Sequence, residues 1–249
     1  MTKGCVYYTD GRLDTSIQRP CELQLRRIAP HPIVFVKLNE VTDRCFNSHG
    51  WLAHGELFGA VKGERGPLTM FRQILVGLEL LETDVAFLTE HDVLYDASHF
   101  AFTPPRADVF YYNANVWRVR ASDGHVLHYP CNQVSGLCAN RELLIEHYRK
   151  RVARVEAHGF SMKMGYEPGT HRRPERVDDY GCESWMSAVP NIDIRHDTNL
   201  SPSRWQKDQF RDQRYTKGWV EGDSVPGWGV TAGRFPEFLA DVVRGEVVA

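Results

Sequence analysis

The sequence predicts an α/β fold in which a mixed, mostly parallel sheet is flanked by helices. Two observations lead to this prediction. Short apolar runs alternate with helical patterns through the N-terminal half of the chain, and a helical stripe over residues 66–81 is followed directly by another apolar run at 85–88. A helix followed by a strand is typical of a parallel sheet, because parallel neighbours cannot be joined by a tight turn and need a crossover connection.

Composition narrows the class of protein. The 249 residues are 42% hydrophobic and 25% charged, with a formal net charge of −2, which is typical of a globular protein and not of a wholly basic nucleic-acid binder. None of the apolar runs approaches the ~20 residues of a membrane span, and the first residues contain no apolar signal core. We therefore expect a cytoplasmic protein without membrane contact. The six cysteines form no C-x-x-C pair, which favours reduced thiols over a zinc knuckle.

The N-terminal elements follow from their residue patterns. Residues 6–8 form a β-rich run that ends in a turn signal at 9–11, and residues 33–36 form a second run, so both indicate buried strands. From Pro67 onward, apolar residues recur at spacings of three and four, which indicates an amphipathic helix with proline in its first turn. These apolar residues are Leu68, Phe71, Leu75, Leu78 and Leu81. Residues 85–88 indicate the next strand.

The second half of the chain continues with strands and helices around one long loop. Further strands are expected at 109–119, 126–129 and 191–194, and further helices at 143–155, 183–188 and 236–243. Periodicity disappears between residues 159 and 180, which predicts a loop of the length that is usually functional or mobile. Neither a repeat nor a long linker interrupts the chain, so we expect a single domain over residues 1–249.

The polar turn after the strand at 85–88 carries the most chemistry. In open α/β sheets ligands bind beyond the carboxyl ends of the strands, and Glu90, His91 and Asp92 are placed there. Two carboxylates two residues apart can hold a hard divalent cation that also binds a diphosphate, because such ions prefer oxygen ligands. The alternative is a solvated polar turn without a ligand.

These features resemble the nucleotide-sugar-binding half of the glycosyltransferases of the GT-A fold. The resemblance rests on a first strand that ends in Thr9 and Asp10, a helix that carries Arg72, and an acidic turn after a central strand. It covers residues 4–120. The remaining residues, 121–249, would then bind the acceptor and supply the catalytic base.

The resemblance implies a role for each residue at this edge of the sheet. The nucleotide of the donor, for which a UDP-sugar is favoured, would be bound by Tyr8, Thr9 and Asp10. Asp92 would coordinate the metal directly, and Arg72 would neutralise phosphate charge. The family's usual motif is Asp-x-Asp, whereas Glu90 stands in the first position here. Glu90 is expected near the ribose and the metal, but its side chain is one methylene longer, so its role would move from a ribose contact to an indirect metal contact or to none.

A histidine downstream completes the expected metal site. His196 follows the strand predicted at 191–194, and the resembled enzymes commonly place a metal-binding histidine at such a position. Imidazole suits a transition-metal ion such as Mn²⁺ better than it suits Mg²⁺ or Ca²⁺. We therefore expect Asp92 and His196 to hold a divalent metal, with Mn²⁺ favoured and Mg²⁺ as the alternative.

The expected catalytic base lies in the second half of the chain. In inverting members of the family, a carboxylate at the start of a helix deprotonates the acceptor hydroxyl, and Glu183 opens the helix predicted at 183–188. A carboxylate suits that task when partial burial raises its pKa. Asp178 and Asp179 are the substitutes for this role. An acid at a helix N-terminus is also explained by the helix dipole alone.

The expected acceptor surface is the segment 201–219. It contains five cations against two aspartates, a local charge of +3, with aromatic residues between them. Cations that contact phosphates and aromatics that stack on bases recur in nucleic-acid binding, although an ion-paired surface helix explains the same pattern. Aromatic residues also bind sugars. The expected acceptor-binding residues are Arg204, Trp205, Lys207 and Arg211.

The last third of the chain resembles phage-type glycosyltransferases that decorate hydroxymethylated pyrimidines in DNA. The resemblance rests on residues 195–200, Trp205, Lys207, Phe210, 218–219 and 225–229. It implies a hydroxymethyl group in DNA as the acceptor and, for a phage-encoded protein, the host cytoplasm as the location.

Together these features predict a metal-dependent, inverting hexosyl- or pentosyltransferase that acts on DNA. Two alternatives stay open. One is a glycosyltransferase that acts on a glycan or a small molecule, and the other is a non-catalytic module that binds a nucleotide or a nucleic acid.

Overall fold

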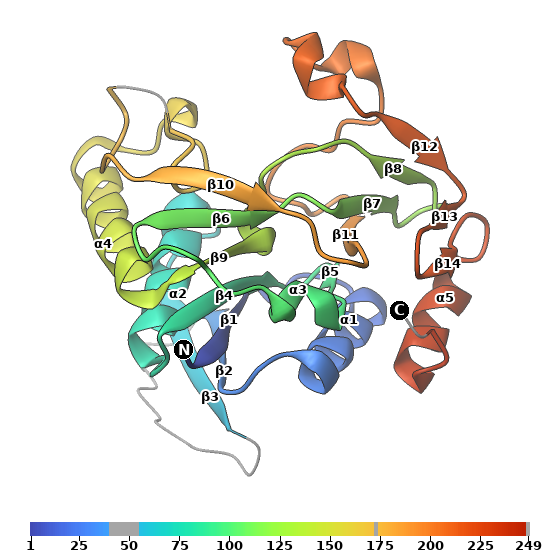
Figure 1. The fold of residues 1–249 in the computed structure, drawn as a ribbon, viewed down its shortest axis with the longest axis horizontal. Coiled ribbons are helices and arrows are strands. Elements are labelled where there is room, and N and C mark those ends of the chain that lie inside the picture. Colours follow the sequence, from blue (N-terminus) through green and yellow to red (C-terminus); the bar gives the residue numbers. More distant parts are fainter. Residues whose placement is uncertain (40–54, 172–173, 248–249) are drawn as a thin grey trace.

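The computed structural model describes residues 1–39, 55–171 and 174–247. Its centre is a seven-stranded sheet with the order β10-β6-β9-β4-β1-β2-β3 (Figure 1). The strands are β1 (Lys3–Thr9), β2 (Ile33–Asn39), β3 (Glu56–Lys62), β4 (Val85–Glu90), β6 (Val109–Asn113), β9 (Leu137–Asn140) and β10 (Gly181–Trp185). Strand β9 runs antiparallel to β4 and β6, and the other neighbouring pairs of this sheet are parallel. The predicted mixed, mostly parallel sheet is therefore confirmed.

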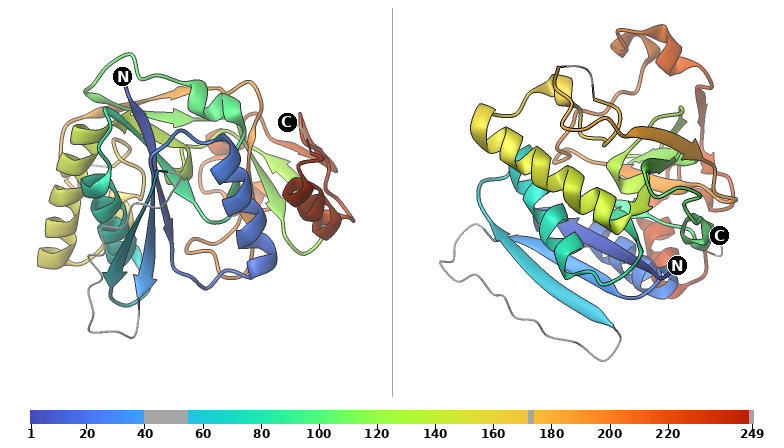
Figure 2. Two further views of the ribbon diagram at one scale, coloured as in Figure 1. Left: turned by 90° about the horizontal axis from the view of Figure 1, so that it is seen from below. Right: turned by 60° about the vertical axis from the view of Figure 1, so that its left-hand side comes forward.

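Helices cover both faces of this sheet (Figure 2). They are α1 (Thr15–Ile28), α2 (Pro67–Leu80), α3 (Ala97–Ala101) and α4 (Arg141–His158), whereas α5 (Phe235–Arg244) packs against α1 and the second sheet described below. Val6 and Tyr8 of β1 pack toward α2 and α4, whereas Cys5 and Tyr7 pack toward α1 and α3, because successive side chains of a strand point to opposite faces. Among the described residues, none of the helices has the length and apolar content needed to cross a membrane.

A second sheet extends the first one. Its order is β12-β8-β7-β11-β5, and β13 (Ser224–Val225) pairs separately with β14 (Gly229–Val230). Its strands are β5 (Val93–Leu94), β7 (Val116–Arg120), β8 (Val126–His128), β11 (Asn191–Arg195) and β12 (Val220–Gly222). Strands β5, β7 and β11 directly follow β4, β6 and β10 in the chain. The chain therefore leaves the central sheet after β4, β6 and β10, and the three strands that follow pair with one another in the second sheet.

Helix α2 shows how the sequence determines this packing. Pro67 occupies its first turn, where the missing amide donor costs nothing. Phe71, Ile74 and Leu78 recur at spacings of three and four and are fully buried against the sheet. Gly77 allows the close approach to β1, since a Cβ at this position would lie 2.3 Å from Cγ1 of Val6.

Two predictions of secondary structure require correction. The helix expected at 183–188 is wrong, because Gly181–Trp185 forms the edge strand β10, in which Glu183 pairs with Tyr111 of β6. The segment 201–219 is not one surface helix but contains the two short 3₁₀ turns η3 (Lys207–Gln209) and η4 (Gln213–Thr216). The other predicted strands and helices are present, with longer or shorter bounds. Within the described part of 159–180, the regular element is the 3₁₀ turn η2 (Met162–Met164).

Candidate active site

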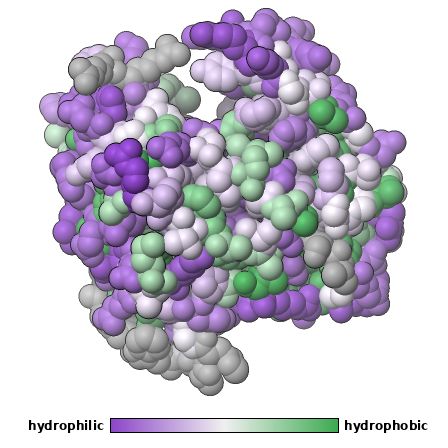
Figure 3. Space-filling model, in the orientation of Figure 1, coloured by the Kyte–Doolittle hydropathy of each residue, from purple (hydrophilic) through white to green (hydrophobic). Residues whose placement is uncertain are grey.

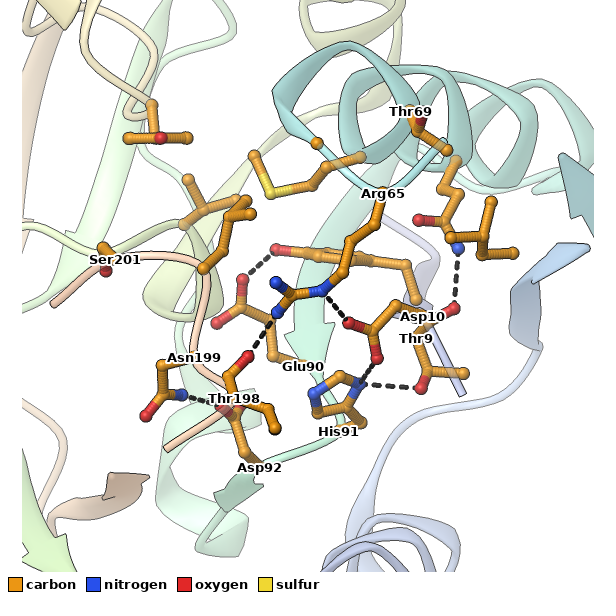
Figure 4. A pocket seen from close by; sticks show the side chains of 18 of the residues that line it. Thr9, Asp10, Arg65, Thr69, Glu90, His91, Asp92, Thr198, Asn199 and Ser201 are labelled. Atoms are coloured by element: carbon orange, nitrogen blue, oxygen red, sulfur yellow. Dashed lines mark hydrogen bonds and ion pairs between the residues drawn. The ribbon is translucent and has the colours of Figure 1, made fainter. Parts of the chain in front are cut away.

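A cavity of about 930 Å³, counted with the space open to solvent, lies where β1 and β4 end. Its floor comes from residues 8–10 at the end of β1 and 90–92 at the end of β4. Its walls come from the start of α2, the loop after α4, the last residue of β11 and residues 198–201. Figure 4 shows Arg65, Asp10 and His91 pointing toward one another, and Asn199 pointing toward Asp92. The cavity therefore occupies the position at which open α/β sheets bind ligands.

The parallel register of β1 and β4 places Tyr8 beside Glu90. The Tyr8 hydroxyl donates a hydrogen bond of 2.5 Å to Glu90 Oε1. Burial, followed by the nearby charge of Asp92, raises the pKa of Glu90 to about 8, because both disfavour the ionised carboxylate. Tyr8 and Glu90 thus form one hydrogen-bonded unit in the cavity.

Asp92 and His196 meet although 104 residues separate them in the chain. The Ile194 amide donates 2.8 Å to the Asp92 carbonyl where β11 runs beside β5, and this contact brings the residue that follows β11 to the acidic turn. His196 Nε2 lies 3.2 Å from Asp92 Oδ2, and Asn199 Nδ2 donates to the same oxygen at 2.8 Å. Burial opposes ionisation, but the hydrogen bond from His196 and the nearby charge of His91 lower the pKa of Asp92.

His91 joins this pair in a group that could hold a metal ion. One ligand atom each from His91, Asp92 and His196 lies within 4.8 Å of the other two. Two imidazoles and one carboxylate are a donor set that suits transition-metal ions. His91 Nδ1 is also 2.7 Å from Thr9 Oγ1, so a residue of the β1 end orients this ring. His91 was not among the metal ligands predicted from the sequence.

Two arginines bring positive charge to the cavity. Arg65, in the turn before α2, donates from Nε to Asp10 Oδ2 at 2.5 Å and also bonds the Thr198 carbonyl (Figure 4). Burial raises the pKa of Asp10, but the hydrogen bond from Arg65 outweighs this effect, so the pKa of Asp10 is lowered. Arg195 is held by the Ser201 carbonyl at 2.7 Å. Both guanidinium groups line the cavity and could contact phosphates.

Arg72, by contrast, does not line the cavity. Its guanidinium lies on the outside of α2 and pairs at 2.7 Å with Glu156 of α4, where both side chains are exposed. The helix was predicted correctly, but Arg72 points away from the edge at which β1 and β4 end. Arg65, which the sequence analysis missed, provides the positive charge on this side. It lies in a turn without periodicity, so only its proximity to the start of α2 could have indicated it.

Glu183 is also not part of the cavity. It is exposed on the edge strand β10 and lines a separate, shallow depression with Arg106 and Asp108. Of its two substitutes, Asp179 lines the same depression, and the Asp178 side chain is buried 2.5 Å from His147 Nδ1. The structure does not bring the expected base to the other predicted site residues.

The cavity contains a different carboxylate, Glu167, that the sequence analysis did not select. It lies in the loop after α4, and burial raises its pKa. The loss of periodicity over 159–180, which is typical of functional loops, was the signal that could have indicated it.

The predicted acceptor residues lie on a separate surface. Trp205 and Lys207 line an open depression with Arg120 and His125, and the Arg120 guanidinium lies 5.0 Å from the Trp205 ring. Arg204 stacks over Phe210, also at 5.0 Å. The exposed Arg211 lies in the link between η3 and η4. Figure 3 shows a hydrophilic lobe in the region of these turns, separated by a notch from the side on which α4 lies.

Comparisons with known proteins add little. Neither a family model nor a curated protein matches this sequence. Similar solved structures include the glycosyltransferase GlyE of Streptococcus pneumoniae TIGR4 (11% identity, TM-score 0.39, 74% of this chain and 45% of that chain). They also include HddC of Yersinia pseudotuberculosis (11%, 0.42, 78% and 93%) and Rv0371c of Mycobacterium tuberculosis H37Rv (12%, 0.39, 78% and 94%). This chain thus spans less than half of GlyE. Likenesses of this size define no family, so the function has to be derived from the cavity.

Proposed function

We propose that this protein is a metal-dependent glycosyltransferase that moves a sugar from a nucleotide-sugar to a hydroxyl group. The observation that carries the proposal is the meeting of His91, Asp92 and His196, of which His91 and Asp92 line a cavity at the ends of β1 and β4. Ligands bind at this edge in open α/β sheets. A cation held by a carboxylate and imidazoles, together with the nearby arginines, would neutralise the negative charge of a bound diphosphate.

In this proposal, one group of residues binds the metal and another contacts the phosphates. Asp92, His196 and His91 hold the metal, for which Mn²⁺ is favoured over Mg²⁺ because of the two imidazoles. When bound, the metal supplies Lewis-acid stabilisation of the leaving diphosphate. Arg65 and Arg195 add donors to the phosphates.

The nucleotide, for which we favour UDP, lies against Tyr8, Thr9 and Asp10. The Tyr8 ring is fixed by its hydrogen bond to Glu90, so this wall of the cavity is ordered before the donor binds.

For the acceptor we propose the hydroxymethyl group of a modified pyrimidine in DNA, with inversion at the sugar. The surface around Arg120, Trp205 and Lys207 supports this acceptor, since it pairs cations with an aromatic ring. A glycan or a small metabolite is the alternative acceptor, because an aromatic ring also binds sugars.

The test combines Mn²⁺, a panel of nucleotide-sugars and DNA that contains hydroxymethylcytosine or hydroxymethyluracil. After digestion, mass spectrometry of the nucleosides should show one added hexose or pentose, and NMR of the product should show inversion. Asp92→Asn should abolish the product, whereas Asp108→Asn, an exposed aspartate paired with Arg106, serves as the matched control.

Other outcomes identify the alternatives. Release of sugar without modified DNA would indicate a different acceptor. Nucleotide binding without any turnover would indicate a binding module and contradict the proposal.

A further inference from the structure

We propose that Glu167 accepts the proton of the acceptor hydroxyl. This inference rests on the proposed function and names the residue that activates the acceptor. Four carboxylates among the described residues line the cavity, and they are Asp10, Glu90, Asp92 and Glu167. Each of the first three is hydrogen-bonded to a side chain, whether an arginine, a tyrosine or a histidine. The described hydrogen bond of the Glu167 carboxylate comes instead from a main-chain amide, that of Tyr166, at 3.2 Å.

This difference in partners matters for proton transfer. A base has to be able to receive a proton, and a charged donor on a carboxylate lowers its pKa and its basicity. Burial raises the pKa of Asp10 and of Asp92, but the hydrogen bonds from Arg65 and from His196 outweigh it, so both pKa values are lowered. Burial raises the pKa of Glu167, and the positive charge of Arg151 only partly opposes that rise. Glu167 is therefore a cavity carboxylate outside the group of His91, Asp92 and His196, and its raised basicity is combined with lone pairs that can accept a proton.

The main chain on the N-terminal side of Glu167 is fixed by Arg151. This arginine of α4 is fully buried, and its guanidinium lies 4.2 Å from the centre of the Phe71 ring. It donates to the carbonyls of Met164, Gly165 and Tyr166, the last at 2.6 Å. A buried guanidinium with several carbonyl partners is costly to move, because each freed group would be desolvated without a partner.

The C-terminal side of Glu167 is fixed as well. The Tyr112 hydroxyl of β6 donates 2.6 Å to the carbonyl of Pro168, the next residue. Glu167 thus lies between two anchored points of a loop that otherwise has little regular structure. Such anchoring holds a catalytic group in a productive position.

The proton step balances within the proposed reaction. The acceptor O–H bond breaks as the acceptor oxygen bonds to the anomeric carbon, and its proton moves to a carboxylate oxygen of Glu167. The bond between the anomeric carbon and the diphosphate oxygen breaks, and its electron pair leaves with the diphosphate. Glu167 then releases the proton to solvent. Water in place of the acceptor follows the same steps and gives hydrolysis of the donor.

The titratable and charged groups around Glu167 come from several elements. They are Tyr148 and Arg151 of α4, Tyr112 of β6, Tyr166 beside it, and Cys131 of the segment between β8 and β9. The pKa values of the tyrosines and of the thiol are raised, so these groups stay neutral while a carboxylate titrates. Glu90 lines the same cavity and also has a raised pKa, so an acid limb in the pH profile of the rate is assigned to Glu167 when E167Q removes it and E90Q keeps it.

The test compares E167Q with E183Q and with E246Q, an exposed glutamate near the C-terminus that pairs with Arg244. Donor turnover is followed with UDP-sugars, Mn²⁺ and hydroxymethylcytosine DNA, both as transfer and as hydrolysis. Binding of UDP with Mn²⁺ is measured by calorimetry. We expect E167Q to bind UDP as the wild type does and to lose about 10²-fold or more in turnover. E246Q should keep its rate.

The pH profile separates a base from a structural residue. The acid limb should disappear in E167Q. E167D should keep the acid limb but turn over more slowly than the wild type, because its side chain is one methylene shorter. Equal thermal unfolding of the variants shows that the fold is intact.

Each other outcome overturns one specific claim. If E167Q keeps its rate, or if E183Q loses turnover and E167Q does not, Glu167 is not the base. If the wild type neither transfers nor hydrolyses any donor, the proposed function fails and this inference fails with it.

Discussion

The His196–Asp92 pair and the His147–Asp178 pair each join a histidine to an aspartate from another segment. His196 Nε2 lies 3.2 Å from Asp92 Oδ2 at the cavity, and His91 is close to both. His147 Nδ1 lies 2.5 Å from Asp178 Oδ2 with both side chains buried, and the Phe110 and Tyr148 rings pack against His147. The same two residue types therefore stand in opposite surroundings.

The difference lies in what each pair can still contact. Asp92 lines a cavity together with His91, Arg65 and Arg195, and His196 is hydrogen-bonded to its carboxylate, so the pair can share an incoming ligand. His147 Nε2 and Asp178 Oδ1 are buried and have no hydrogen-bond partner among the described residues. A buried polar pair of this kind fixes α4 to the loop that precedes β10, and breaking it leaves a group desolvated without a partner. We therefore expect one pair to act in catalysis and the other in stability.

The largest effect expected from this comparison is that of Asp92→Asn on turnover. It removes the one carboxylate of the metal group and should lower sugar transfer about 10³-fold, because metal stabilisation of the leaving group amounts to several kcal/mol. The near-isosteric amide keeps contact with Asn199, so the thermal midpoint should change little. Steady-state kinetics and Mn²⁺ titration measure the two effects. Full turnover in this variant would remove Asp92 from the metal site.

The opposite pattern is expected for His147→Ala. Loss of a fully buried ring leaves a cavity and removes the His147 hydrogen bond from the buried Asp178 carboxylate, so the free energy of unfolding should fall by about 2–4 kcal/mol. Binding of UDP and Mn²⁺ should persist at temperatures at which the variant is folded. Urea unfolding and calorimetry provide the two measurements. Unchanged stability together with lost turnover would show that the His147–Asp178 pair acts in catalysis, which would contradict the difference drawn here between the two pairs.

A third prediction concerns buried histidines and pH. Burial lowers the pKa of His99 to about 3, and Nδ1 of its ring lies within hydrogen-bond distance of Asn113 and Asn191. The folded pKa is below the unfolded value of about 6.5, so the unfolded state binds more protons between these values and stability falls as the pH falls.

The expected loss from His99 is about 2 kcal/mol between pH 6.5 and pH 5. Urea unfolding at the two pH values measures it, and His99→Gln should flatten the dependence by about that amount. An equal slope in the variant would show that His99 is not the source.

Much of the fold and part of the site could be predicted from the sequence. The strands at β1, β2 and β4 and the helix α2 have strong apolar patterns that local physics determines. Asp92 and His196 were predicted because each follows an apolar run, and the ends of such runs gather at one edge of a sheet. Their proximity is confirmed at 3.2 Å.

The misses have a common physical cause. Arg65 and Glu167 lie in segments without periodicity, and their place in the cavity comes from tertiary contacts such as the Arg151 hydrogen bonds to the loop carbonyls. The Glu183 helix was wrong because 181–185 gains its conformation from pairing with β6 and not from its own pattern. Local propensity is weak where a neighbouring strand supplies the hydrogen bonds.

The smallest expected effect compares Arg65, which lines the cavity, with Arg72, which was predicted to neutralise phosphate charge but does not line the cavity. Arg65→Ala should weaken binding of UDP with Mn²⁺ about tenfold, the contribution of one hydrogen bond to a charged group, and the Asp10 carboxylate left beside the phosphates adds to the loss. Arg72→Ala should change binding less than about twofold, because it breaks only an exposed pair with Glu156. Calorimetry on both variants decides between them. A larger loss for Arg72→Ala would mean that the phosphates lie over α2 and not at the edge where Asp92 and His196 meet.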